Sequence, residues 1–372
     1  MSTLDRTNAF IVLNGLPNIG PITLRRLLDA FQGDPVSIFN ATSSQLKAVQ
    51  GVGDAVVSTL NNWTDLLDLD KQLDRMEKSG IRFVVTAADA YPPMLKEIYD
   101  PPIGLYWKGD YVLDRPTVAI VGSRKTTLYG RHVARKLGRE LARCGFCVVS
   151  GGARGVDTEA HKGALEVDGK TISVMGCGMD IVYPAENFDL FNEIAQSGAV
   201  ISEFPFGRRA DRQTFPMRNR IVSGMCQALI VVESDLQGGS MISARFAAEQ
   251  GRTVFAVPGR IDQPTSRGCH QLIREGAMLL SKPEDVVEEL GYLIINQASD
   301  ERLDTGLGSD SLSEEEREIL SHFSGGEVLD MDRLIDMTGK SSPELASLLM
   351  MLELKHLVSK RFDGAFEASV RM

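Results

Sequence analysis

The chain has 372 residues, of which 43% are hydrophobic and 24% charged, proportions typical of a globular protein with two or three domains. No run approaches the roughly 18 apolar residues of a membrane span, and the first residues lack the charged start and apolar core of a signal peptide, so we expect a cytoplasmic protein with no membrane partner. The net charge of −10 lies mainly in residues 297–372, with 16 acidic and 8 basic residues, whereas residues 1–296 are nearly neutral and can carry a local basic cleft.

Residues 1–75 are predicted to form a small helical domain. Short helical stretches are broken at two similar glycine turns, Leu16–Pro21 (LPNIGP) and Val49–Asp54 (VQGVGD). Each turn resembles the hairpin of helix-hairpin-helix, SAM-like domains, in which backbone N–H groups approach DNA phosphate, but glycines also simply end helices. Because few basic residues surround the turns, both interpretations stay open.

Residues 76–296 alternate between apolar strand candidates and segments with helical periodicity. That alternation predicts an α/β fold with a doubly wound, mostly parallel, extended Rossmann-like sheet, whose ligands bind outside the carboxyl ends of the strands. The predicted strands are Val118–Val121, Phe146–Val149, Thr171–Met175, Ala199–Ile201, Ala228–Val232 and Thr253–Val257, and the helices between them include Thr127–Arg143, Asp157–Leu165 and Ser240–Gln250.

Two glycine-rich turns at these strand ends form the candidate site. A glycine turn that leads into a helix exposes free N–H groups at the positive end of the helix dipole, and so favours phosphate. An arginine in each turn strengthens the prediction of a phosphate site. The residues concerned are Gly122, Ser123, Arg124 and Lys125 in the first turn, and Gly151, Gly152, Arg154 and Gly155 in the second.

Asp157 and His161 are four residues apart at the start of a predicted helix, and therefore on one face. They could form an acid–base pair, but we expect Asp157 to be the N-cap of the helix and His161 to orient or contact the ligand. No nucleophile accompanies them. We therefore expect no catalytic residue.

The common nucleotide cofactors do not fit these turns. The first reads GSRKTTLYG in place of GxGxxG, and the second strand ends in Ser150-Gly151-Gly152, without the acidic residue that binds a ribose. The Walker motif GxxxxGK[ST] and the nucleophile elbow GxSxG are also absent from the sequence. We expect no cofactor.

Arginines are concentrated between Arg208 and Arg220, where five of them stand against one acid, Asp211. Because this part of the chain is nearly neutral, the concentration of arginines favours a groove that binds a polyanion. Arg218, Asn219 and Arg220 are expected to lie near that groove. The alternative is that some of these arginines pair with acids of the fold and brace it. For Arg220 both interpretations stay open.

The five cysteines are too few, and odd in number, for a disulfide framework. Cys144 and Cys147 match C-x-x-C, but they lie where a predicted helix ends and a strand begins, and no second pair completes a zinc site. We expect these cysteines to pack in the core, and we expect no metal.

Residues 297–311 are rich in Ser, Gly and Asp and are predicted to be a linker. Residues 312–372 hold three amphipathic helical segments and a hairpin-like ending, an order similar to a winged-helix domain. The acidity of this domain argues against DNA binding, and we interpret it as a protein-interaction or regulatory module. The three segments are Ser313–Phe323, Met331–Thr338 and Ser342–Leu354.

Taken in order, these motifs resemble the DNA-processing protein A family, also called DprA or Smf. The matching segments lie between Val118 and Ala277 and read GSRKTTLYG, SGGARGVDTEAH, GCGMDIVYPAEN, SEFPFG, FPMRNRIVSG, VVESDLQGGSMISA, FAVPGR and GCHQLIREGA. The segment YPPMLKEIYDPPIGLYWKGD, which precedes them, also fits. The resemblance implies a homodimer that binds single-stranded DNA without sequence preference and helps load RecA recombinase on incoming strands during natural transformation.

The same resemblance implies which residues line the DNA pocket. The sequence departs from the family pattern at two places. Glu186 lies in a segment that is often basic in relatives, and Gly238-Gly239 replaces the usual Ser-Gly. The expected DNA-binding positions are Gly122, Ser123, Arg124, Lys125, Gly151, Gly152, Arg154, Gly155, Asp157, His161, Arg218, Asn219 and Arg220.

Two rival functions remain. LOG-type nucleotide phosphoribohydrolases share a Rossmann-like fold, but their motif PGGxGTxxE supplies a catalytic glutamate, and Gly238-Gly239 is followed here by SMISAR. The other rival is a protein-interaction scaffold whose cleft is vestigial.

Overall fold

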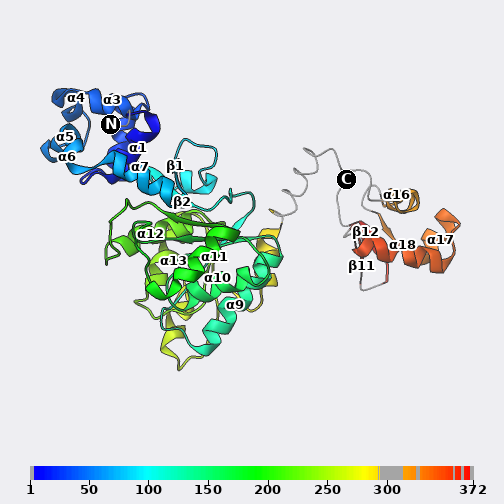
Figure 1. Cartoon of the computed structure of the whole chain (residues 1–372). Helices are drawn as coiled ribbons and strands as arrows, with labels where there is room; N and C mark the ends of the chain where they lie inside the picture. The colour runs from blue at the N-terminus through cyan, green and yellow to red at the C-terminus, as the bar shows by residue number, and fades with distance from the viewer. Residues whose placement is uncertain are drawn as a thin grey trace. The chain divides into compact units, whose positions relative to one another are not determined.

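The computed structural model describes residues 4–291, 293, 313–323, 327–354, 357–361 and 364–368. The chain divides into two compact units, Met1–Ile295 and Asn296–Met372 (Figure 1). The predicted linker, residues 297–311, lies outside the described residues. In the part of the chain that the structure covers, no helix has the length and apolar character needed to cross a bilayer.

The first unit begins with a bundle of short helices, blue in Figure 1. Gly20 and Gly53 are the N-caps of the helices that follow the two glycine turns, so each turn separates two helices as predicted. The apolar faces of the bundle pack on Tyr106 and Phe206 of the sheet region, which joins the two parts in one core. The helices are α1 (Arg6–Gly15), α2 (Pro21–Ala30), α3 (Pro35–Asn40), α4 (Ser43–Lys47), α5 (Asp54–Asn61), α6 (Trp63–Leu66) and α7 (Leu69–Lys78).

A sheet of nine strands forms the centre of the unit, in the order β1-β2-β6-β5-β4-β3-β7-β8-β9. The strands from β6 to β9 are parallel, and β1 and β2 extend the sheet with antiparallel pairing. The strands are β1 (Ile81–Val85), β2 (Gly104–Lys108), β3 (Thr117–Val121), β4 (Cys147–Ser150), β5 (Thr171–Val174), β6 (Ala199–Ser202), β7 (Ala228–Val231), β8 (Thr253–Ala256) and β9 (Met278–Leu279).

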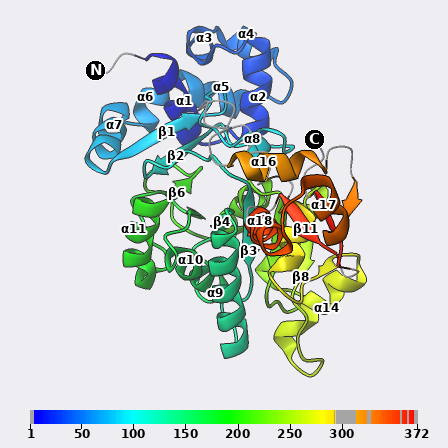
Figure 2. The same cartoon turned by 90° about the vertical axis from the view of Figure 1, so that its right-hand side faces the viewer.

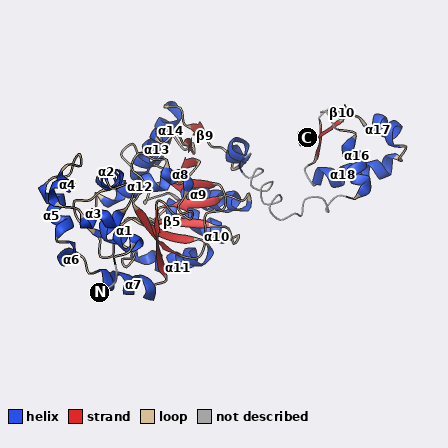
Figure 3. Ribbon diagram, turned by 90° about the horizontal axis from the view of Figure 1, so that it is seen from above, coloured by secondary structure: helices blue, strands red, loops and turns tan. Residues whose placement is uncertain are grey.

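Helices cover both faces of this sheet, as Figure 3 shows. One face packs on helices α9 (Leu128–Arg143), α10 (Val156–Leu165) and α11 (Phe188–Ser197), and the other on helices α8 (Pro93–Lys96), α12 (Thr214–Gly224), α13 (Gly239–Glu249) and α14 (Arg267–Arg274). Since both faces are covered, strands such as β3, β4 and β7 are buried along their whole length. The doubly wound α/β prediction is confirmed.

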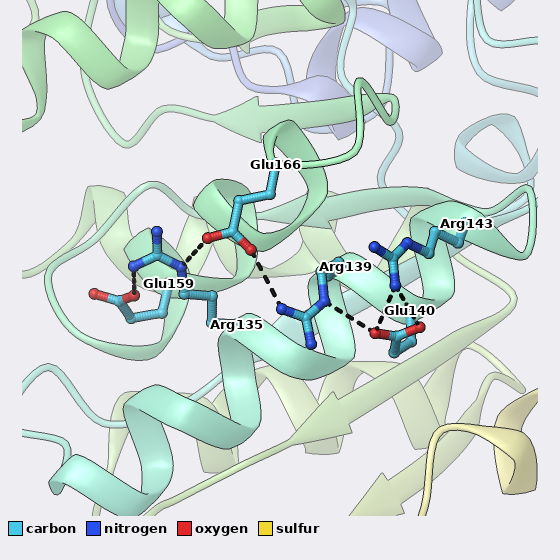
Figure 4. A network of polar contacts seen from close by, with 6 residues as sticks. All are labelled: Arg135, Arg139, Glu140, Arg143, Glu159 and Glu166. Carbon is cyan, nitrogen blue, oxygen red and sulfur yellow. Dashed lines mark hydrogen bonds and ion pairs between the residues drawn. The ribbon is translucent and has the colours of Figure 1, made fainter.

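A network of surface ion pairs links α9 to α10 (Figure 4). Arg135 contacts both Glu159 and Glu166, and Arg139 contacts Glu166 at 3.7 Å as well as Glu140 at 2.9 Å. These side chains are partly exposed, so each pair contributes less than about 1 kcal/mol. The close approach of the two helices at Gly138 and Gly163, where a Cβ would overlap the backbone of the other helix, fixes their packing more strictly.

The second unit has its own core and the order of a winged helix (orange to red in Figures 1 and 2). In its described residues, three strands form a sheet in the order β10-β12-β11 beside three helices, which confirms the winged-helix prediction. The elements are α16 (Glu314–Ser321), β10 (Val328–Leu329), α17 (Met331–Thr338), α18 (Ser342–Leu354), β11 (Val358–Lys360) and β12 (Phe366–Ala368).

Candidate functional site

The two glycine turns meet at the carboxyl edge of the sheet, where β3 lies between β4 and β7. The chain winds in opposite directions on either side of β3, and such a reversal leaves a crevice between the strand ends. A cleft of about 380 Å³ lies there. It is lined by Val121, Gly122, Ser123, Arg124, Gly151, Ala153, Asp157, Arg212, Phe215, Pro216, Arg218, Asn219, Val222, Ser234, Asp235, Gly238, Gly239, Ser240, Ile242 and Ser243.

The buried carboxylate of Glu233, just after β7, holds the first turn. It accepts hydrogen bonds from the hydroxyl of Thr126 at 2.6 Å and from both the N–H (2.8 Å) and the hydroxyl (2.6 Å) of Thr127, the N-cap of α9. The Glu233 carbonyl also accepts from the Ser123 N–H at 2.7 Å. Glu233 therefore braces the turn through the two threonines.

Arg124 and Lys125 project from this turn with exposed side chains. The Arg124 guanidinium lies 4.4 Å from the centre of the Phe215 ring, in cation–π contact. No carboxylate pairs with Arg124 among the described residues. The contact with Phe215 therefore fixes the direction of the cation and leaves its charge available to an anion.

The second turn needs its glycines for different reasons. Gly152 and Gly155 have φ of +64° and +82°, in the left-handed region that favours glycine. Gly151 is buried beneath Arg218, and a Cβ on it would overlap the guanidinium. The amide of Asn187 donates to the Gly152 carbonyl at 3.0 Å and holds the turn in place.

Arg218 and Asp157 form the floor of the cleft, and only 4% and 6% of their side chains are exposed. Arg218 donates to the Val174 carbonyl at 2.7 Å, and Asp157 accepts from the Ala153 N–H at 3.3 Å. Burial raises the pKa of Asp157, and the positive charge of Arg218 opposes that shift. The N-cap of α10 is Gly155, so the prediction that Asp157 is the N-cap was wrong. Its carboxylate instead reaches back to the turn.

His161 does not reach the cleft. Its ring is fully buried, and Nδ1 donates to the Thr171 hydroxyl at 2.7 Å, which itself donates to the Val148 carbonyl. Burial lowers the pKa of His161 to about 3, so the ring is neutral at pH 7. The predicted contact with a ligand does not fit a ring without exposed surface.

Arg220 braces the fold. Its guanidinium, of which 4% is exposed, bonds the Glu203 carboxylate at 2.5 Å and Asp100 at 3.1 Å. Glu203 is itself buried. Of the two interpretations left open by the sequence, the structure favours bracing over contact with a ligand.

Arg154 projects outward from the second turn and forms an ion pair with Glu186, with Nη2 to Oε2 at 3.0 Å. Both side chains are at least half exposed, at 59% and 50%. Hydrogen bonding from Arg154 holds the pKa of Glu186 well below its usual range. The departure from the family pattern at Glu186 thus places an acid directly against a predicted phosphate ligand.

Sequence reasoning missed several residues of the site. Phe215 orients Arg124, Ser240 donates to Ser234 at 2.8 Å, and the Asn219 amide donates to the Gly239 carbonyl at 3.3 Å. Asn219 was predicted and does line the cleft. The signal for Ser234 and Ser240 was their place just after the predicted strand Ala228–Val232, at the carboxyl edge where ligands bind, and the signal for Phe215 was its place in the motif FPMRNRIVSG.

The chemistry of the cleft suits a phosphate. It combines glycine N–H groups, two exposed arginines (Arg124 and Arg212) and the buried Arg218 with apolar walls. Among the described residues, no group of three or more His, Cys, Asp and Glu side chains could hold a metal ion.

Comparison with known proteins gives a consistent picture. The family model for DNA recombination-mediator protein A matches residues 82–291, and the model for the DprA winged helix domain matches residues 307–363. Protein Smf from Synechocystis sp. is 33% identical over 293 residues, which cover 77% of this chain and 73% of the relative. DNA processing protein DprA from Bacillus subtilis is 40% identical over 60% of this chain and 75% of its own.

Two solved structures are also similar. That of DNA processing protein A from Streptococcus pneumoniae matches with a TM-score of 0.65 and 35% identity, over 76% of this chain and 98% of its own. That of DNA processing protein A from Helicobacter pylori, described for its single-stranded DNA binding mode, matches with a TM-score of 0.52 and 34% identity, over 57% of this chain and 97% of its own.

Proposed function

Because this chain belongs to the DNA recombination-mediator protein A family, we propose that it binds single-stranded DNA, without sequence preference, in the cleft at the carboxyl edge of the sheet. One observation carries the proposal: Arg124 stands exposed on the first glycine turn, oriented by Phe215 and unpaired among the described residues. The Helicobacter pylori relative, which is described as binding single-stranded DNA, supports it.

The cleft supports backbone recognition rather than base readout. Turn N–H groups and arginines bind phosphate oxygens, which are identical in every nucleotide. Arg218 adds a buried positive charge below the turns, and its Nε has no hydrogen-bond partner among the described residues. Phosphate contacts of this kind fix the position of a strand and carry no sequence information.

We further propose that the protein is a binding protein and not an enzyme, and that it helps load RecA recombinase on incoming strands during transformation. The family description as a recombination mediator supports this role. The rival phosphoribohydrolase lacks support, because the glycine pair Gly238-Gly239 leads into Ser240 and Met241 and not into the required glutamate pattern.

We also propose a homodimer, formed through the β9 edge of the sheet. β9 pairs with β8 on one side, and among the described residues no strand pairs with its other side. Met278 and Leu279 on this edge are 40% and 52% exposed, and Leu236 beside them is 52% exposed. An open, apolar strand edge is a template for pairing with a second copy. A Leu279→Arg variant should halve the solution mass while its thermal melting stays cooperative.

The central proposal is tested by binding to oligo-dT and to mixed-sequence oligonucleotides as salt rises. Affinity should fall with salt, with a slope of about −0.7 per phosphate contacted, and should be equal for both sequences. Absent or salt-independent binding would refute the proposal. Release of ribose phosphate from a nucleoside monophosphate would instead support the enzymatic rival.

A further inference from the structure

A second cavity, of about 500 Å³, lies between the N-terminal helices and the loop that joins β1 to β2. We name it the basic groove. Apolar side chains of α1 and α2, such as Phe10 and Leu24, form part of its wall. Its charged residues are the cations Arg6, Arg25, Arg26 and Lys96 and the acids Asp29 and Asp100.

Each of the four cations is positioned by a backbone carbonyl instead of a carboxylate. In the described residues none of the four forms an ion pair. Neutral acceptors thus fix the direction of these side chains, and Arg6 in addition interacts electrostatically with Asp34, the N-cap of α3. The contacts are Arg6 to Gly33 at 3.1 Å, Arg25 to Tyr99 at 3.4 Å, Arg26 to Gln50 at 3.3 Å and Lys96 to Ala88 at 3.3 Å.

The acids of the basic groove do not balance these charges. Asp100 is already bonded to Arg220 at 3.1 Å, which leaves Asp29 against four cations. On α9, by contrast, Arg135 and Arg143 both pair with glutamates. The basic groove therefore presents an excess of positive charge to solvent, and such a surface attracts a polyanion.

An aromatic ring stands beside these cations. Tyr99 is 80% exposed, and Ile22 on α2 is 41% exposed. An exposed aromatic ring next to positive charge provides a stacking platform for an unpaired base, with no preference for which base. An acidic peptide would use the charges but not the ring, so the combination favours a nucleic acid strand.

The basic groove lies at the same edge of the sheet as the cleft. β2 runs antiparallel to β6 and Tyr106 pairs with Ser202, so the loop that precedes Gly104 lies beyond the carboxyl end of β6. A direct link joins the two sites, because Asn219 lines the cleft and the next residue, Arg220, bonds Asp100 of the basic groove.

We propose that the basic groove is a second binding site for the same single strand, with phosphates on Arg25 and Arg26 and a base stacked on Tyr99. This inference rests on the proposed function, because its ligand is the strand held in the cleft. It gives the helical domain a role in setting the length of bound DNA. It also gives the turn Val49–Asp54 a function, since the Gln50 carbonyl positions Arg26.

The test compares full-length protein on oligo-dT of about 8 nucleotides and of about four times that length. Arg25→Gln/Arg26→Gln should bind the long strand about tenfold more weakly, bind the short strand like the wild type, and lose about 1.4 from the salt slope for the long strand. Tyr99→Ala should weaken long-strand binding about tenfold with an unchanged salt slope, because stacking releases no counterions.

The matched control is Lys136→Gln/Lys162→Gln, which removes two exposed positive charges from α9 and α10. It should bind both lengths like the wild type. If the groove variants match this control, or lose affinity equally for both lengths, the second site is refuted while the cleft proposal stands. If the wild type binds neither length, the proposed function itself fails.

Discussion

At the scale of single residues, the structure separates an arginine that is free to bind from one that braces. The Arg124 side chain is exposed and in cation–π contact with Phe215, whereas Arg220 is buried and pairs with Glu203 and Asp100. In the sequence the two residues look alike, because each is a basic residue near the edge of the sheet where ligands bind. Burial and the identity of the partner decide which of them carries function.

Arg124→Ala should weaken binding to every oligonucleotide sequence by about tenfold and reduce the salt slope by about 0.7, because one phosphate contact is lost. Since the side chain is exposed, the free energy of unfolding should change by less than about 0.5 kcal/mol. Binding titrations at several salt concentrations, together with thermal melting, check both expectations. A sequence-dependent loss would contradict backbone recognition.

Glu186→Gln should strengthen binding. The Glu186 carboxylate forms an ion pair with Arg154, at the place where a phosphate would bind. The neutral amide that the substitution introduces cannot form this pair, so Arg154 becomes available to bind a DNA phosphate. We expect affinity about threefold higher and a salt slope steeper by about 0.7. The reverse result, weaker binding, would mean that the ion pair positions Arg154 rather than competing for it.

Arg220→Ala should destabilise the fold by about 3–5 kcal/mol, because it leaves the Glu203 carboxylate buried without its partner. Chemical denaturation measures the loss. Replacing both members with apolar residues, Arg220→Met/Glu203→Leu, should recover much of it. If the single variant binds weakly but unfolds like the wild type, Arg220 is a ligand contact and not a brace.

The loss of stability caused by Arg220→Ala should depend on pH, because the Glu203 carboxyl titrates. Burial raises the pKa of Glu203 to about 6 even with Arg220 present, so the native state binds its proton more tightly than the unfolded state does. The stability contributed by this group is therefore present below its unfolded pKa, about 4.3, and is lost as pH rises toward 6. Removing Arg220 raises the native pKa further. The destabilisation by Arg220→Ala should thus be smaller at pH 5 than at pH 7.

At the scale of elements, the point where the two glycine turns touch is tightly constrained. Gly155 has φ of +82°, and a Cβ on it would overlap the backbone carbonyl of Ser123, which accepts from the Val156 N–H at 3.3 Å. The first turn and the start of α10 are therefore in direct backbone contact. A change at this position acts on both halves of the phosphate site.

Gly155→Ala should lower the free energy of unfolding by more than about 2 kcal/mol and abolish tight binding, because it adds backbone strain and forces the turns apart. Gly207→Ala is the control. Gly207 has nearly the same φ, +83°, but a Cβ there meets open space, so only strain of about 1 kcal/mol is expected. Equal losses in the two variants would show that the contact between the turns is unimportant.

The sequence predicted the elements better than it predicted the directions of side chains. Strands β3 to β8 are continuous apolar runs, and each was found within a residue or two of its bounds. The strands β1 and β2 escaped detection because they pair antiparallel and precede the regular alternation of strand and helix, and β9 escaped because it has only two residues. His161 was misplaced since helical spacing shows which residues share a face but not which way the face turns. The partners of Arg220 lie 17 residues and more away in the chain, beyond any local pattern.

At the scale of the whole molecule, charge is divided between the two units. The Asn296–Met372 unit holds most of the net negative charge, and the first unit holds the cleft and the basic groove. Each unit has its own hydrophobic core, so removal of the second does not open the first. A net charge of about −8 near a bound strand repels phosphate within roughly a Debye length.

Deleting residues 297–372 should therefore leave affinity for single-stranded DNA unchanged or raise it, most visibly at low salt, where screening is weakest. Binding of the full-length and shortened proteins to the same oligonucleotide across a salt series measures the effect. A gain that disappears at high salt identifies electrostatic repulsion as its cause. A large loss of affinity at every salt concentration would instead show that the acidic winged helix contacts DNA, because removal of a repulsive neighbour cannot weaken binding.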